Sequence, residues 1–317
     1  MKVVLLGNPD FAVPSLRRLA ASRHEVAAVV TNPDRASGRG RRLRPPPVKT
    51  AAAALGLPVL QPDSPRDPAL AEQLKALAPD ALGVVAYSIL PERLLRVPRL
   101  GSVNVHPSLL PAYRGAAPIV WALFDGCTET GVTTFLLNRR VDAGDILLQE
   151  RVTIGGDETA GELEARLAED GARLLVRSLD GMEDGSLRPR PQPPEGVSRA
   201  PKLTREDGRI DWSWPAERVR NRVRGANPWP GAFTEWAGGV LKVHRVERVE
   251  PAARAASPGE VLCCGSEDGV VVACADGAVR LGEVQPAGRE RMSGGAFARG
   301  YPLRPGDRLG GESGDQG

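Results

Sequence analysis

The strongest constraint on the fold is an alternation of short apolar runs with helical segments over nearly two hundred residues. Runs at 2–7, 25–31 and 80–87 have the length and composition of buried strands. Segments at 11–21 and 67–77 have the pattern of helices. Further strands are predicted at 57–62 and 100–106, and further helices at 48–55, 117–126 and 158–179. This order predicts an α/β, Rossmann-like domain with an open, mostly parallel sheet covered on both faces.

The pattern changes near residue 187. Residues 187–208 are rich in proline and charge and have no apolar period, which is typical of an interdomain linker. Short valine-rich runs follow, and the Asp-Gly pair in ADGA (275–278) favours a hairpin. The second half therefore predicts a smaller C-terminal β-barrel, similar to oligonucleotide-binding barrels, or a sandwich. The predicted boundaries are a catalytic domain at 1–187, a linker at 188–207, a barrel at 208–309 and a flexible tail at 310–317.

Composition excludes several classes of protein. Hydrophobic residues make up 41% of the chain, which argues against disorder, and no apolar stretch approaches the roughly 20 residues that span a bilayer. The start, MKVVLLGNPD, lacks a small-residue cleavage site and is interpreted as a first strand, so we expect a cytoplasmic protein. The four cysteines have no zinc-binding spacing, and we expect no metal.

The segment NVHPSLLPAYRGAAP (104–118) contains the chain's most informative histidine. If 100–106 is a strand, Asn104 and His106 share one face at its carboxyl end, where open parallel sheets bind ligands. An asparagine amide can donate a hydrogen bond to a developing oxyanion, and a histidine can move a proton near neutral pH. Asp142, in the loop VDAGD, is the candidate carboxylate that orients the imidazole, and Asp145 competes with it. Alternatively, Asn104 caps a turn and His106 only satisfies a backbone carbonyl.

The next four residues suggest a binding wall. Ser108, Leu109, Leu110 and Pro111 form a turn beside the predicted site, which could hold a flat heterocycle through main-chain hydrogen bonds. A plain loop that buries its leucines is the alternative. LLGNPDF has one glycine where a dinucleotide fingerprint needs three, which argues against NAD.

These motifs resemble the folate-dependent formyltransferases. NVHPSLLPAYRGAAPI and ETGVTTFLLNRRVDAGDIL (129–147) carry the resemblance to that family. GNPDFAVPSL, TNPDRASGRGRRLRPPPVK, RIDWSWPAERVRNRVRGANPWPGA and EVQPAGRERMSG extend it from the first strand nearly to the tail and point to the members that act on tRNA.

The resemblance implies an activity and a set of site residues. It implies formyl transfer from 10-formyltetrahydrofolate to the α-amino group of methionine on initiator tRNA, without a metal. We also expect a monomer. It assigns Asn104, His106 and Asp142 as the catalytic trio, and Ser108, Leu109, Leu110 and Pro111 as the folate-contacting loop. The expected mechanism has Asn104 and a protonated His106 donating to the oxyanion, while Asp142 holds the imidazolium.

The resemblance also gives a role to the basic segment after the second strand. This glycine- and proline-punctuated loop is the expected tRNA contact, through Arg35, Arg39, Arg41, Arg42, Arg44 and Lys49. Taken alone, it would be a solvated surface loop. The basic residues of ERVRNRVRG recur every second position, so in a helix they cannot share one face.

Three other functions stay open at this point. The chain could formylate a small amine, or it could hydrolyse 10-formyltetrahydrofolate with water in place of the amine. It could also be a non-catalytic RNA-binding module. The basic loop argues against the first, and the trio of Asn104, His106 and Asp142 argues against the last.

Overall fold

The computed structural model describes residues 1–37, 42–250, 256–265 and 269–310. The chain divides into two compact units that do not follow sequence order. The first unit contains residues 1–118, 129–154 and 164–201, and the second contains 119–128, 155–163 and 202–317. Among the described residues, no helix has both the length and the apolar character needed to span a membrane.

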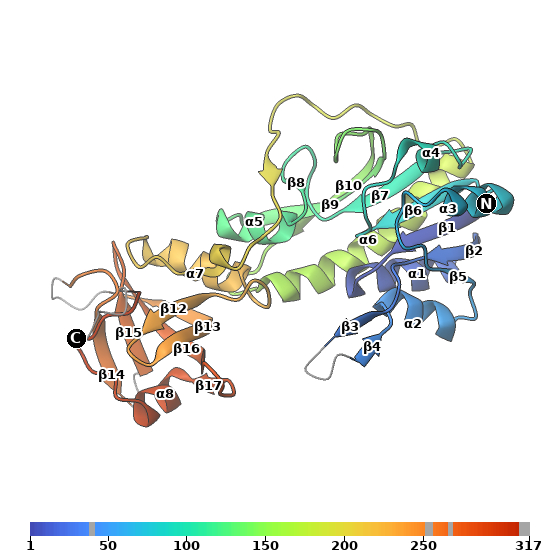
Figure 1. Ribbon diagram of the computed structural model, residues 1–317. Helices are drawn as coiled ribbons and strands as arrows, with labels where there is room; N and C mark the ends of the chain where they lie inside the picture. The colour runs from blue at the N-terminus through green and yellow to red at the C-terminus, as the bar shows by residue number, and fades with distance from the viewer. Residues whose placement is uncertain (38–41, 251–255, 266–268, 311–317) are drawn as a thin grey trace. The chain divides into compact units, whose positions relative to one another are not determined.

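The first unit is built on a seven-stranded sheet (Figure 1) in the order β10-β9-β7-β6-β1-β2-β5. The five strands from β7 to β5 in this order pair in parallel, whereas β9 runs antiparallel to both β7 and β10. The predicted open, mostly parallel sheet is therefore confirmed. Its strands are β1 (Lys2–Gly7), β2 (Glu25–Val30), β5 (Val59–Leu60), β6 (Ala81–Val85), β7 (Ser102–His106), β9 (Glu129–Leu136) and β10 (Ile146–Thr153).

Helices cover both faces of this sheet, because successive residues of its central strands point to opposite faces and are apolar in both directions. Val4 and Leu6 of β1 share a buried cluster with residues of α3 and α4 on one face. On the other face, a Cβ on Gly83 would lie 3.5 Å from Leu175 of α6, which shows how closely that helix packs. The helices are η1 (Asp10–Ala12), α1 (Val13–Ala20), α2 (Pro47–Ala54), α3 (Pro68–Leu77), α4 (Glu92–Leu95) and α6 (Ala160–Glu183).

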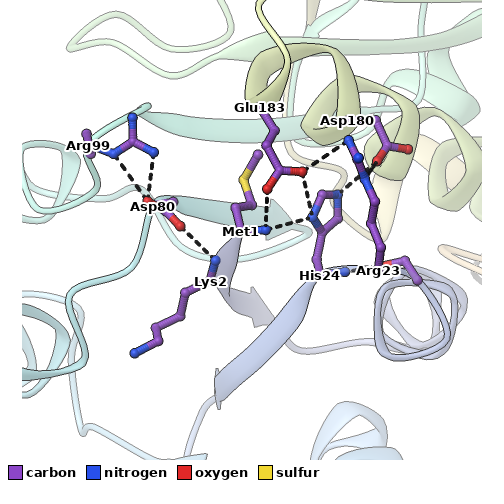
Figure 2. Close-up of polar contacts among 9 residues, drawn as sticks. Met1, Lys2, Arg23, His24, Asp80, Arg99, Asp180 and Glu183 are labelled. Atoms are coloured by element: carbon purple, nitrogen blue, oxygen red, sulfur yellow. Dashed lines mark hydrogen bonds and ion pairs between the residues drawn. The ribbon is translucent and has the colours of Figure 1, made fainter.

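A network of ion pairs fastens the end of α6 to the start of the sheet (Figure 2). The buried ring of His24 lies 3.4 Å from Oδ1 of Asp180 and 3.8 Å from Oε2 of Glu183. Arg23 donates to Asp180 at 2.6 Å, and the Met1 amino group donates to Glu183 at 2.6 Å. Both carboxylates already hold cationic groups, so we interpret this cluster as a structural ion network rather than as a metal site.

The segment expected as a linker packs along the first unit for most of its length. Arg190 exchanges two backbone hydrogen bonds with Ile146, at 2.7 and 2.8 Å. Strand β11 (Arg199–Ala200) pairs in parallel with β8 (Arg114–Gly115). Backbone pairing of this kind leaves no charge or apolar pattern in the sequence, so the composition that predicts an interdomain linker gives no sign of it. A hairpin, β3 (Arg35–Ser37) with β4 (Arg42–Arg44), also belongs to this unit.

The second unit is an antiparallel sheet in the order β12-β13-β16-β15-β14, with β17 paired to β16. Within the described ranges no ladder joins β12 to β14, so we describe a sheet and not a closed barrel. The predicted hairpin is present, because Ala273 pairs with Ala278 and Cys274 donates to the Gly277 carbonyl. The strands are β12 (Phe233–Trp236), β13 (Gly239–Val249), β14 (Val261–Gly265), β15 (Gly269–Ala273), β16 (Ala278–Pro286) and β17 (Met292–Ser293).

Helix α5 belongs to the second unit although it precedes β9 in the chain. The guanidinium of Arg222 lies 3.8 Å from the ring centroid of Phe124, and a Cβ on Gly225 would lie 2.7 Å from that ring. These contacts hold α5 against α7 and explain why the unit boundary departs from the predicted one. The helices here are α5 (Pro118–Phe124), η2 (Glu206–Gly208), α7 (Ala216–Gly225) and α8 (Gly294–Gly300).

Candidate active site

His106 ends strand β7 with its ring buried. Nε2 lies 2.9 Å from the carbonyl oxygen of Tyr113. The imidazole and the Phe135 ring form a T-shaped contact, with their ring centroids 6.5 Å apart. Because a carbonyl oxygen can only accept, Nε2 carries the hydrogen of the neutral ring. Nδ1 is therefore the nitrogen that can take up a proton.

Asp142 is brought to the side of this ring by the loop between β9 and β10. Its Oδ2 lies 3.9 Å from Nδ1 of His106 and accepts a hydrogen bond from the Gly115 N–H at 2.8 Å. Asp142 has a left-handed backbone, with φ of 49°, which aspartate tolerates better than most residues. The competing Asp145 is exposed, so the structure pairs His106 with Asp142.

Burial decides the charge of His106. Desolvation lowers the pKa of His106 below its ordinary value, while the Asp142 carboxylate and the Tyr113 carbonyl act in the opposite direction. The imidazole is therefore neutral at neutral pH. The expected mechanism has a protonated His106 that donates to the oxyanion, and a ring that starts neutral first has to take up a proton.

Asn104 lies two residues before His106 on the same face of β7 and pairs with Val84 and Phe135 on the neighbouring strands. Its side chain is half-buried and, within the described part of the chain, makes no hydrogen bond. An unbonded carboxamide beside a buried imidazole can donate to a substrate oxygen.

The 108–111 loop makes several hydrogen bonds with the protein around it. The Ser108 hydroxyl donates to the Ala112 carbonyl at 2.6 Å, and the Leu110 carbonyl accepts from Gln149 at 2.8 Å. Ser108 and Leu110 are both buried. The Pro111 carbonyl accepts from the N–H of Ser198 at 3.4 Å. The expected main-chain contact of this loop with a heterocycle stays a prediction. The loop forms a wall in which Leu110 is buried and Leu109 is partly exposed.

The basic residues predicted to bind tRNA fall into three groups. Arg35 and Arg44 are exposed and face each other across the β3–β4 hairpin. Lys49 lies in α2, and its Nζ binds both oxygens of Asp34 at 2.8 and 2.9 Å, so its charge is already compensated. Arg39 and Arg41 lie outside the described residues, as does the side chain of Arg42.

Two backbone groups of the site could not be predicted from the sequence. The Tyr113 carbonyl orients His106, and the Gly115 N–H holds Asp142. Gly115 has φ of 132°, and a Cβ there would lie 2.3 Å from the Ala200 carbonyl oxygen. The glycine in YRGAAP was the one available signal, because such a backbone conformation requires glycine.

This fold and site define a formyl transferase. The family model described as formyl transferase matches residues 1–179, and the model of the formyl transferase C-terminal domain matches 202–302. The chain is 49% identical over 318 residues to a protein from Heliobacterium modesticaldum, covering 98% of this chain and 100% of the relative. It is 45% identical over 311 residues to one from Citrifermentans bemidjiense, covering 98% and 96%. Both relatives are named methionyl-tRNA formyltransferase. The chain belongs to the methionyl-tRNA formyltransferase family.

A solved structure shows the same fold. HypX from Aquifex aeolicus in complex with tetrahydrofolic acid aligns with a TM-score of 0.65 at 20% identity, covering 98% of this chain and 50% of that one.

Proposed function

We propose that this protein transfers the formyl group of 10-formyltetrahydrofolate to the α-amino group of methionine on initiator methionyl-tRNA. The observation that carries the proposal is the 3.9 Å approach of Asp142 to the buried, neutral imidazole of His106, in a chain 49% identical to a methionyl-tRNA formyltransferase. Translation starts in the cytoplasm, and we infer that location from the substrate.

The residues present fit a folate co-substrate. Ile89 and Val141, in the loops after β6 and before Asp142, expose 78% and 56% of their surface, which suits a flat, largely apolar heterocycle. The solved structure with bound tetrahydrofolic acid supports the same class of ligand. When bound, 10-formyltetrahydrofolate supplies an electrophilic formyl carbon and an amine leaving group.

The protein's own groups then have separate tasks. Asn104 donates its free amide N–H to the formyl oxygen as negative charge develops there. Nδ1 of His106 takes the proton that the methionine amine loses on attack, and the imidazolium formed faces the Asp142 carboxylate. The Tyr113 carbonyl keeps the ring in place by accepting from Nε2. The proton then passes from His106 to the departing nitrogen.

Arg35 and Arg44 supply exposed positive charge for the RNA backbone. In α7, Arg220 is paired with Asp157 and Glu217, and Arg222 stacks on Phe124. Arg218 is the exposed arginine of that helix, at 4.4 Å from the Trp214 ring, and is the one we propose as an RNA contact.

The testing experiment incubates the protein with 10-formyltetrahydrofolate and charged methionyl-tRNA, either initiator or elongator. Formyl-methionine on initiator tRNA, in clear excess over elongator tRNA, is the expected product. Formate release at the same rate without any tRNA would instead indicate a hydrolase. Transfer to a small amine with none to tRNA would also overturn the proposal.

A further inference from the structure

Gln192 stands out in the segment that crosses the first unit after α6. We call residues 188–200 the strap. From Arg188 to Arg199 every strap residue is exposed except Gln192, which is half-buried. A polar residue drawn inward from an exposed, proline-rich segment indicates a specific contact.

The Gln192 carboxamide uses both its donor and its acceptor. Nε2 donates to the Asp142 carbonyl at 2.9 Å and to the Gly144 carbonyl at 2.8 Å. Oε1 accepts from Nε and Nη2 of Arg114 at 3.2 and 2.6 Å. A carboxamide is suited to this place because it offers two N–H donors and one acceptor oxygen in a single plane.

These bonds hold a loop that is unfavourable by itself. Asp142 has a positive φ, so the loop needs contacts from outside to keep that conformation. Gln192 fixes the backbone of Asp142, while the Gly115 N–H fixes its side chain. Together they set the direction in which the carboxylate points toward His106.

The strap holds the opposite loop as well. Ser198 Oγ accepts from the Tyr113 N–H at 2.8 Å, and the Ala200 carbonyl accepts from the Ala116 N–H at 2.7 Å. Tyr113 is the residue whose carbonyl binds His106. One strap therefore touches both loops that orient the imidazole and the carboxylate.

We propose that Gln192 is a positioning residue for formyl transfer, which acts by fixing the Asp142 loop so that its carboxylate faces His106. The inference rests on the proposed function. It assigns no contact between Gln192 and either substrate.

The first test compares Gln192→Ala and Gln192→Glu with wild type in the full chain. Glutamate keeps the size and the acceptor toward Arg114 but lacks the two N–H donors, so both variants should lower kcat by about 10- to 100-fold, since small misplacements of reacting groups have costs of this order. KM for methionyl-tRNA should stay within about twofold. Glu195→Ala, on an exposed strap residue, is the matched control and should match wild type.

A double-mutant cycle separates positioning from a general structural effect. If Gln192 acts through Asp142, the Gln192→Ala/Asp142→Asn double variant should be no slower than Asp142→Asn alone. The acidic limb of the plot of kcat against pH should move in the same direction in Gln192→Ala and in Asp142→Asn. A double variant whose rate loss equals the product of the two single losses would overturn the proposal. So would a Gln192→Ala variant with unchanged kcat and an unchanged pH profile.

The same assay distinguishes the two levels of the account. A folded wild type that transfers no formyl group to tRNA contradicts the proposed function. An active wild type with an equally active Gln192→Ala variant contradicts only the positioning role. Thermal unfolding and circular dichroism of each variant show whether a slower rate reflects a damaged fold.

Discussion

Nδ1 of His106 and Oδ2 of Asp142 lie 3.9 Å apart, and the same carboxylate oxygen accepts the Gly115 N–H. The separation is too long for a direct hydrogen bond but short enough for strong electrostatic coupling in a buried site. A neutral imidazole and a carboxylate in this relationship can receive a proton and stabilise the resulting charge.

Replacing Asn104 tests the oxyanion contact. Asn104→Ala should lower kcat by about 100- to 1000-fold, the usual effect of losing one such donor. The side chain makes no hydrogen bond within the described part of the chain, so thermal stability should change little. Steady-state kinetics and a melting curve check both points. A variant with normal turnover would remove Asn104 from the mechanism.

Gly115→Ala tests the backbone that holds Asp142. The new Cβ would lie 2.3 Å from the Ala200 carbonyl oxygen, and alanine is strained at φ of 132°. We expect a loss of roughly 1–3 kcal/mol in the free energy of unfolding, together with a slower reaction. Urea denaturation and kinetics measure the two effects. Gly56→Ala is a useful control, since Gly56 also has positive φ but has nothing near its Cβ and lies outside the site.

Arg35 and Arg44 are predicted to contribute to tRNA affinity by neutralising phosphates. The Arg35→Ala/Arg44→Ala variant should bind methionyl-tRNA more weakly and with a shallower dependence on salt, by about one unit of slope for each phosphate that is no longer neutralised. Binding at several salt concentrations measures this. Arg66→Ala, on another exposed arginine of the same unit, should leave the slope unchanged. An unaltered slope in the double variant would exclude the hairpin from the interface.

Stability should fall in mild acid. Burial lowers the pKa of His24, His106 and His244 in the folded protein. As the pH falls, the histidines of the unfolded chain therefore take up protons before those of the folded protein do, which favours unfolding. Their contribution is present above about pH 6.5, the ordinary histidine value, and is lost as the pH falls toward the lowered values. Urea denaturation between pH 8 and 5.5 should show this loss. The loss of stability should be smaller in the His24→Asn variant, because the buried ring of His24 in the ion network of Figure 2 is then absent. A loss equal to that of wild type would rule out His24 as a source.

Much of the first unit could be predicted from the sequence. Its strands are short apolar runs, and local patterns of this kind fix the element type. Asn104 and His106 share a face because of the strand period, which requires no tertiary information. Residue spacing leaves Asp142 and Asp145 both open as partners of His106, and the resemblance assigns Asp142. The fold of the 139–145 loop forms the contact between Asp142 and His106.

The remaining features depend on contacts between distant backbone groups. The antiparallel β9 and the pairing of β11 with β8 have no distinctive composition. The role of the Tyr113 carbonyl is independent of its side chain, so no residue type signals it. Likewise, Lys49 belongs to the basic segment by sequence, but its ion pair with Asp34 is a property of the fold.

The most direct measurement is the single-turnover rate of formyl transfer from 10-formyltetrahydrofolate to initiator methionyl-tRNA, for wild type and for Asp142→Asn. Asparagine also tolerates the left-handed backbone at this position, so the variant removes the charge and keeps the loop. We predict rapid formylation by wild type and a rate about 100-fold lower or more in the variant, with tetrahydrofolate binding unchanged. Equal rates in the two proteins, or no transfer by wild type, would contradict the account.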